Sequence, residues 1–151
     1  MKEQVASASR VIDAPAERIY EIIAHYRDQH PRILPGQYFL SLNVEEGGYG
    51  AGTIINFSMR ILGQAQTFRS LITEPAPGRL LVETDIRSQT PTSFEVMSTG
   101  DASRVTISTV LKGRSWIEGL LAKPMLQKIY RQELELLGEL AVHPIKRPQN
   151  L

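Results

Sequence analysis

The sequence predicts an α+β domain built from a strand, two short helices, six strands joined as hairpins and a long C-terminal helix. Between residues 37 and 112, apolar side chains recur at every second position, as in strands with one buried face. Beyond residue 116 they recur at helical spacing. The connections between the strands are short and rich in glycine and proline, which is typical of hairpins. We therefore expect an antiparallel sheet that is covered on one face.

The length, charge and composition of the chain restrict the class of protein to which it can belong. The chain has 151 residues, enough for one domain with a sizeable core, and 17 basic against 16 acidic residues give a formal charge of +1. This balance provides no strong field for nucleic acid or an anionic membrane. The absence of cysteine excludes disulfides and thiolate metal sites. With no signal-like N-terminus and no stretch of about 20 apolar residues, we expect a soluble, cytoplasmic protein without integral membrane association.

The N-terminal region predicts a strand followed by a helix and a break. Residues 3–12 alternate weakly and form the expected first strand. In 13–27, Asp13 can cap a helix and Pro15 suits its first turn. The two prolines of 28–36 end that helix and favour a short second helix or an irregular loop. Four residues of the first helix lie at helical spacing: Ile19, Ile22, Ile23 and Tyr26.

The six later strands each present one mainly apolar face, which we expect to point inward. These faces are Tyr38, Leu40, Leu42 and Val44; Thr53, Ile55, Phe57, Met59 and Ile61; Phe68, Ser70 and Ile72; Leu80, Val82, Thr84 and Ile86; Thr92, Phe94 and Val96; and Val105, Ile107, Thr109 and Leu111. The opposite faces carry the polar residues, among them Arg60, Arg69, Glu83, Asp85, Arg87 and Glu95. Turns are expected at 75–78 and 99–102.

The stretch GGYGAGT, residues 47–53, has the glycine content of a phosphate-binding loop. A dinucleotide fingerprint, however, follows a strand and opens a helix. Here the glycines lie between the strands expected at 37–45 and 53–62, so we interpret them as a hairpin tip in which Val44 pairs with Thr53. In the next hairpin, a turn at Gly63-Gln64 would pair Met59 with Phe68 and Ile55 with Ile72.

The C-terminal helix is amphipathic, with one exception. Pro124 either kinks one helix or starts a second. Glu133 falls at the centre of the apolar half of the helix. That half contains Met125, Leu126, Ile129, Tyr130, Leu134, Leu136, Leu137, Leu140 and Ala141. We expect one domain over residues 1–142 and a flexible tail over 143–151.

Four segments carry a resemblance to a known family. They are RVIDAPAERIYEIIAHYRD, VEEGGYGAGTIINF, ITEPAPGRLLVETD and SRVTIST. Together with the order of elements, they resemble the START-like, or SRPBCC, superfamily, which includes the polyketide cyclase/dehydrase family. The resemblance implies a helix-grip fold, in which a curved seven-stranded antiparallel sheet wraps around the long C-terminal helix and leaves a cavity between them. Members of this superfamily bind lipids, sterols, quinones, polyketides or plant hormones, and some cyclise or dehydrate their ligand.

Glu133 is the sharpest candidate for chemistry. A carboxyl group that faces an apolar cavity has a raised pKa and can act as a general acid or base, or bind a ligand hydroxyl. Alternatively, its head group reaches the helix edge or pairs with an arginine or a backbone amide. In an enzyme, Glu133 would serve as the acid/base while Tyr130 polarises a carbonyl.

The expected cavity combines inward strand residues, helix residues and the segment after the first helix, which borders the cavity mouth in the family. Small hydroxylated residues on the inward faces leave room and polar groups for a ligand, although threonine is also simply a good strand residue. The candidate ligand-binding residues are Tyr26, His30, Ile33, Tyr38, Ile55, Phe57, Met59, Phe68, Ser70, Thr84, Phe94, Thr109, Trp116, Met125, Ile129 and Leu137.

We expect no metal site, because the three histidines are scattered and His25 and His30 are five residues apart. No flavin or nicotinamide motif predicts a cofactor, and no basic run predicts a nucleic-acid partner. The sequence favours a protein that binds a small hydrophobic ligand between sheet and helix. The alternatives are a cyclase/dehydratase-type enzyme, and a groove that accepts a protein partner or lipid chain.

Overall fold

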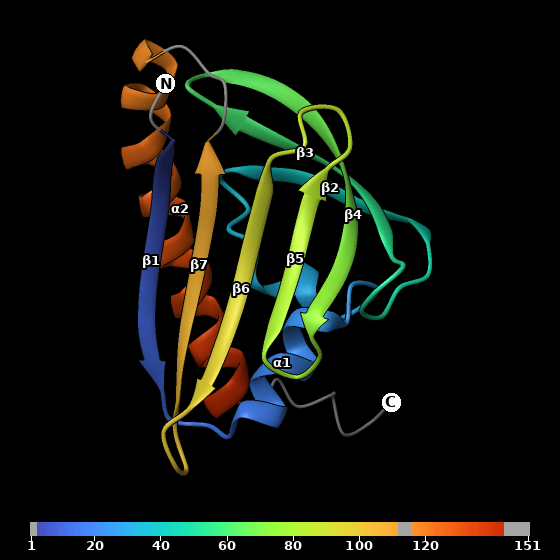
Figure 1. The fold of residues 1–151 in the computed structure, drawn as a ribbon, viewed down its shortest axis with the longest axis vertical. Coiled ribbons are helices and arrows are strands. Elements are labelled where there is room, and N and C mark those ends of the chain that lie inside the picture. Colours follow the sequence, from blue (N-terminus) through green and yellow to red (C-terminus); the bar gives the residue numbers. More distant parts are fainter. Residues whose placement is uncertain (1–2, 112–115, 144–151) are drawn as a thin grey trace, which may run out of the picture.

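The fold is a single curved antiparallel sheet with helices on one face (Figure 1). The computed structural model describes residues 3–111 and 116–143, without the side chains of 116–121. The described strands form one seven-stranded sheet in the order β1-β7-β6-β5-β4-β3-β2, which confirms the predicted fold class. The elements are β1 (Gln4–Ile12), α1 (Ala16–Ala24), the 3₁₀ helix η1 (His30–Ile33), β2 (Phe39–Glu46), β3 (Ile54–Ile61), β4 (Gln64–Ala76), β5 (Leu80–Asp85), β6 (Pro91–Ser98), β7 (Ser103–Leu111) and α2 (Trp116–Val142).

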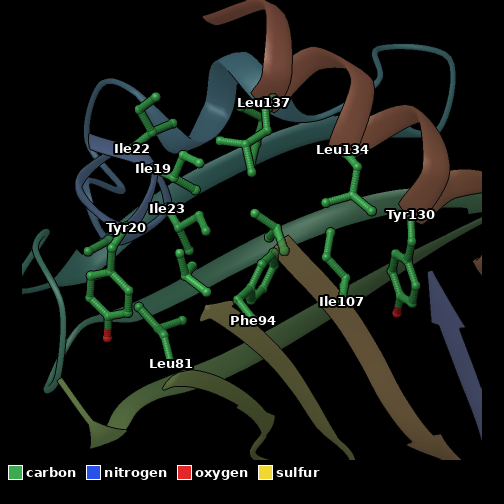
Figure 2. Close-up of a cluster of buried hydrophobic side chains, with 14 of the residues drawn as sticks. Ile19, Tyr20, Ile22, Ile23, Leu81, Phe94, Ile107, Tyr130, Leu134 and Leu137 are labelled. Atoms are coloured by element: carbon green, nitrogen blue, oxygen red, sulfur yellow. The ribbon is translucent and has the colours of Figure 1, made fainter. Parts of the chain in front are cut away.

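Both α-helices lie on the same face of the sheet, and the core fills the space between (Figures 1 and 2). Leu134 and Leu137 of α2 point at the strands in Figure 2, and both are fully buried. Pro124 lies inside α2, which continues through it as one helix. Since each fully buried Leu or Ile side chain contributes about 1.5–3 kcal/mol, this layer stabilises the placement of α2 over the sheet.

Helix α1 confirms the predicted spacing, because Ile19, Ile22 and Ile23 are all buried. The predicted cap is wrong. The N-cap residue is Pro15, and it makes no side-chain capping hydrogen bond. Asp13 lies two residues before the N-cap position, too early for its carboxylate to accept from the first helical amides.

The β3–β4 turn differs from the prediction by two residues in register. The turn residues are Leu62 and Gly63, whose φ values of 52° and 80° are both positive. Two positive φ values match the right-handed twist of a two-residue hairpin. Met59 therefore pairs with Gln66, not with Phe68, and Ile55 pairs with Ser70. Because the shift is an even number of residues, the inward and outward faces stay as predicted.

Strand β2 is irregular, and this overturns two predictions. Val44 pairs with Ile55 and not with Thr53, and the register shifts between Phe39 and Ser41 and again between Val44 and Glu46. Leu40 is 47% exposed instead of pointing inward. A β-bulge adds an unpaired residue and so exchanges the faces on either side of it.

Strand β5 presents the opposite face from the predicted one. Leu81 is fully buried, and Glu83 pairs with Ile72 of β4. Leu80, Val82 and Thr84 therefore face outward, and the carboxylates at 83 and 85 face the helix layer. The alternation LLVETD is compatible with either face, since it has a leucine in both phases.

The glycine-rich stretch 47–53 connects β2 to β3, as predicted. It also fastens the end of α1 to the sheet, because Gly50 N–H donates to the carbonyl of Ala24 at 3.0 Å. Gly50 has φ 62°, and the carboxylate of Glu74 lies where a side chain would start. Glycine is needed at this position for both reasons.

Candidate functional site

A cavity of about 390 Å³ lies between the sheet, η1 and α2. This volume is within the range of about 300–1,000 Å³ that is typical of small-molecule sites. The helix side contributes Ala122, Leu126, Tyr130 and Glu133. The other lining residues are His30, Leu34, Phe39, Leu42, Ile55, Phe57, Met59, Ile61, Leu62, Gln64, Gln66, Phe68, Ser70, Glu83, Asp85, Ser88, Thr90, Thr92, Phe94, Thr109 and Leu111.

An aromatic wall forms one side of the cavity. The rings of Phe57 and Phe68 stack with centroids 5.3 Å apart, and Phe39 lies 6.2 Å from Phe57. These residues come from three adjacent strands, β2 to β4. The bulge in β2 is what brings Phe39 to this face. Such a wall supplies apolar area and flat ring faces to a ligand.

A polar cluster forms around Glu83, which lines the cavity from β5. The hydroxyl of Tyr26 donates to Glu83 Oε2 at 2.6 Å. His30 Nε2 lies 3.6 Å from the same oxygen, and the rings of Tyr26 and His30 stack with centroids 4.3 Å apart. His30 Nδ1 is 2.7 Å from the carbonyl oxygen of Ile23. Because a carbonyl only accepts, Nδ1 carries the proton, and Nε2 of the neutral ring is a bare acceptor.

Burial shifts both titratable groups of this cluster toward their neutral forms. Desolvation raises the pKa of Glu83 from 4.5 to about 7, although the hydrogen bond from Tyr26 acts against this rise. Desolvation lowers the pKa of His30 from 6.5 to about 4. At neutral pH the histidine is therefore uncharged, and Glu83 is close to its midpoint.

Glu133 lies in the cavity, as its position on the helical wheel predicted. It is 3% exposed and lines the cavity from α2. Within the described residues its carboxyl group makes no side-chain hydrogen bond. Burial, followed by the charge of Glu83, raises the pKa of Glu133 well above its ordinary value. Burial thus raises the pKa of two of the cavity's carboxyl groups, and the charge of Glu83 further disfavours the ionisation of Glu133.

Tyr130 belongs to a short chain of hydroxyl groups. Its phenol contacts Thr109 Oγ1, which in turn lies 2.6 Å from Thr92 Oγ1. Burial raises the pKa of Tyr130, so the phenol keeps its proton throughout the physiological range. The three hydroxyls link α2 to β7 and β6 and leave a polar strip on the cavity wall.

The structure brings together part of the predicted site. The predicted residues that line the cavity are His30, Ile55, Phe57, Met59, Phe68, Ser70, Phe94, Thr109, Tyr130 and Glu133. Tyr26, Ile33, Ile129 and Leu137 are buried in the core, and Tyr38 and Met125 pack against it. Thr84 is on the outer face of β5. The side chain of Trp116 and the tail 144–151 lie outside the described residues.

Sequence reasoning missed Glu83, although a signal was available. Counting back from the predicted turn at 75–78 places Leu81 opposite Ile72 and Glu83 opposite Ser70. Because Ile72 and Ser70 are predicted to point inward, this pairing places Leu81 and Glu83 on the inward face of β5 as well. The alternation of apolar residues favours the opposite face, because Leu80, Val82 and Ile86 lie on it. The polarity of the residues alone therefore does not reveal that the carboxyl group of Glu83 is buried.

Among residues 3–111 and 116–143, no group of three or more metal-ligating side chains is placed to hold a metal ion. No helix in these same ranges has the length and apolar character needed to cross a bilayer.

Comparison with known proteins places these features in a family. No curated protein sequence matches the chain. The KanY protein, solved by NMR, is similar in fold, with a TM-score of 0.83, 23% identity and coverage of 94% of this chain and 99% of that one. A START superfamily protein from Mycobacterium smegmatis has a TM-score of 0.76 at 14% identity, covering 93% and 99% of the two chains. The Zhui aromatase/cyclase from Streptomyces sp. R1128 has a TM-score of 0.69 at 14% identity, covering 96% and 97%.

At these identities the structures show a shared fold and nothing more. The sequence model described as polyketide cyclase/dehydrase and lipid transport matches residues 3–142, which is nearly the whole chain. The curved sheet, the long C-terminal helix and the cavity between them accord with that match. The chain therefore belongs to the polyketide cyclase/dehydrase and lipid transport family.

Proposed function

We propose that this protein binds a small, largely apolar molecule in the cavity between the sheet and α2. The observation that carries the proposal is a cavity of about 390 Å³ whose lining combines an aromatic wall with a small set of polar groups. Burial of the ligand's apolar surface supplies most of the affinity, at roughly 25 cal/mol per Å². Glu83, Glu133 and the Tyr130 hydroxyl chain orient its polar end.

Native mass spectrometry of the purified protein, followed by analysis of any released compound, tests this proposal first. Binding of the neutral fluorophore N-phenylnaphthylamine then tests the cavity directly. We expect fluorescence enhancement that saturates at one molecule per chain. An empty protein that also fails to bind the fluorophore would overturn the proposal and favour a groove for a protein partner.

A matched pair of variants shows whether the probe occupies this cavity. Ser70 is 3% exposed and lines the cavity, whereas Thr73 lies on the outer face of the same strand and is exposed. The substitution Ser70→Leu fills part of the cavity and should weaken binding of the fluorophore. Thr73→Leu adds a similar apolar group outside and should leave binding unchanged. Equal effects of both substitutions would place the probe elsewhere.

The second candidate is a cyclase/dehydratase-type enzyme that uses the cavity carboxyls as acid and base. One observation favours it: the carboxyl group of Glu83 is buried in the cavity lining, and this burial raises its pKa to about 7, the range in which a general acid/base works best at neutral pH. Tyr130 lines the same cavity and could donate to a carbonyl oxygen. With a candidate substrate in hand, Glu83→Gln or Glu133→Gln should abolish turnover while binding persists. Loss of binding and turnover together would show that the carboxyl group binds the substrate, and binding without turnover by the natural sequence would support a carrier.

A further inference from the structure

The charged groups that face the cavity from the described residues are all carboxyl groups, whereas the serine, threonine and glutamine side chains of the lining can both donate and accept hydrogen bonds. Glu83 and Asp85 reach the cavity from β5 and Glu133 from α2, while the described lining contains no lysine or arginine. His30 of η1 adds a neutral ring whose Nε2 is a bare acceptor. Tyr26, at the end of α1, already donates its proton to Glu83. The hydroxyl of Tyr130 is engaged with Thr109.

The three carboxyl groups differ in the hydrogen bonds that they already accept from other groups of the protein. Asp85 Oδ2 accepts from the backbone amide and the hydroxyl of Ser88, both at 2.8 Å, so Asp85 stabilises the turn after β5. Glu83 Oε2 accepts from Tyr26. Glu133 is only 3% exposed and lines the cavity, and within the described residues its carboxyl group makes no side-chain hydrogen bond. Its oxygens face the cavity, so a donor on the cavity's occupant can reach them.

We propose that the ligand carries a protonated amine, which binds between the carboxyl groups of Glu83 and Glu133 while its apolar body lies against the aromatic wall of Phe57 and Phe68. An ammonium group has three donors and no acceptor, which suits a lining of carboxyl oxygens and a bare imidazole nitrogen. Charge-assisted hydrogen bonds of this kind are about twice as strong as neutral ones. The proposal rests on the proposed ligand-binding function and specifies its chemical class.

The charge balance makes binding depend on pH in a definite direction. In the free protein burial holds the two carboxyl groups toward their neutral forms, and the charge of Glu83 adds to this effect at Glu133. An ammonium group favours the ionised form, so its binding releases a proton. Affinity should therefore rise about tenfold per pH unit below pH about 7 and level off above it. A ligand that accepts hydrogen bonds from the protonated carboxyls, such as a ketone, should show the opposite dependence.

Isothermal titration calorimetry with three probes of one apolar frame tests the proposal: phenylbutylamine, phenylbutanol and phenylbutyric acid. We expect the amine to bind at least about tenfold more tightly than the alcohol at neutral pH, and the acid to bind most weakly. Repeating the amine titration at pH about 6, where Glu83 of the free protein is mostly protonated, in buffers with different ionisation enthalpies should show release of about one proton.

Glutamine substitutions identify the groups responsible. Glu133→Gln and Glu83→Gln keep the side-chain shape but cannot ionise, so each should lower the affinity of the amine toward that of the alcohol. The affinity of the alcohol should fall by less than that of the amine, because glutamine still offers the hydroxyl group a hydrogen-bond partner, and its remaining binding also shows that the variants are folded. Glu95→Gln is the matched control, because Glu95 is exposed on β6 and lies outside the cavity lining.

The outcomes separate this inference from the function on which it rests. If the alcohol or the acid binds as tightly as the amine, or if the amine's affinity does not change with pH, the amine proposal is overturned while ligand binding stands. The amine proposal is also overturned if the glutamine variants still bind the amine more tightly than the alcohol. If neither the three probes nor N-phenylnaphthylamine bind, both proposals fail together.

Discussion

Replacement of Glu83 by glutamine should make the protein more stable at neutral pH and leave its stability unchanged in acid. Glu83 is 12% exposed, and burial raises its pKa from 4.5 to about 7. In the unfolded chain the carboxyl group regains its ordinary pKa. Below pH about 4.5 the group is protonated in both states and contributes no change with pH.

Between these two pH values the unfolded state loses its proton first, so stability falls as pH rises. A pKa difference from 4.5 to about 7 corresponds to about 3 kcal/mol. Glutamine cannot ionise, and its amide oxygen can still accept from Tyr26. The free energy of unfolding of Glu83→Gln should therefore equal that of the natural sequence below pH about 4.5, and exceed it by up to about 3 kcal/mol above pH about 7.

Urea denaturation of both proteins over this pH range measures the difference directly. Glu95→Gln, on the exposed outer face of β6, should track the natural sequence at every pH. If the curves for the natural sequence and Glu83→Gln run parallel, Glu83 titrates normally in the folded protein. The account of a carboxyl group held neutral by the cavity would then be wrong.

Four further substitutions test the interpretation of the glycine-rich stretch, the β3–β4 turn and the hydroxyl chain by urea denaturation. Gly50→Ala should cost about 1–3 kcal/mol, since it strains a residue at φ 62° and places a methyl group 2.5 Å from the Glu74 carboxylate. Gly52→Ala meets open space at φ 91° and should cost less; equal losses would refute the clash. Leu62→Asn, at φ 52° and 55% exposed, should stabilise the β3–β4 turn by about 1 kcal/mol, and any loss would contradict the turn assignment. Thr109→Val should cost about 1–3 kcal/mol, because it leaves the hydroxyls on either side without their partner; an unchanged value would show that water replaces it.

The fold could be predicted from the sequence because its signals are local and repeated. The change from a period of about 3.6 to a period of two identified the elements, and the short turns required neighbouring strands to pair antiparallel. Glu133 was found in the same way. A helical wheel has one apolar half, and a charged residue at its centre has to face the interior.

The faces of two strands depended on the tertiary structure. In β2 a bulge turned Leu40 outward and Phe39 into the aromatic wall, and alternation alone does not show where an extra residue is inserted. In β5 either phase of LLVETD could be buried. Pairing with Ile72 on one side and Thr92 on the other decided the face. The cost of burying Glu83 is offset by Tyr26, a residue far away in the sequence.

The sequence by itself therefore determined the order of the elements, the family and the position of Glu133, one of the two carboxyl groups in the proposed binding site. These depend on periodicity and turn chemistry, which act over a few residues. Only the tertiary structure decided the second carboxyl, the aromatic wall and the pairing of Tyr26 and His30 with Glu83. Those features arise where segments distant in sequence meet, and there the hydrogen bonds and burial supplied by one segment set the ionisation of another.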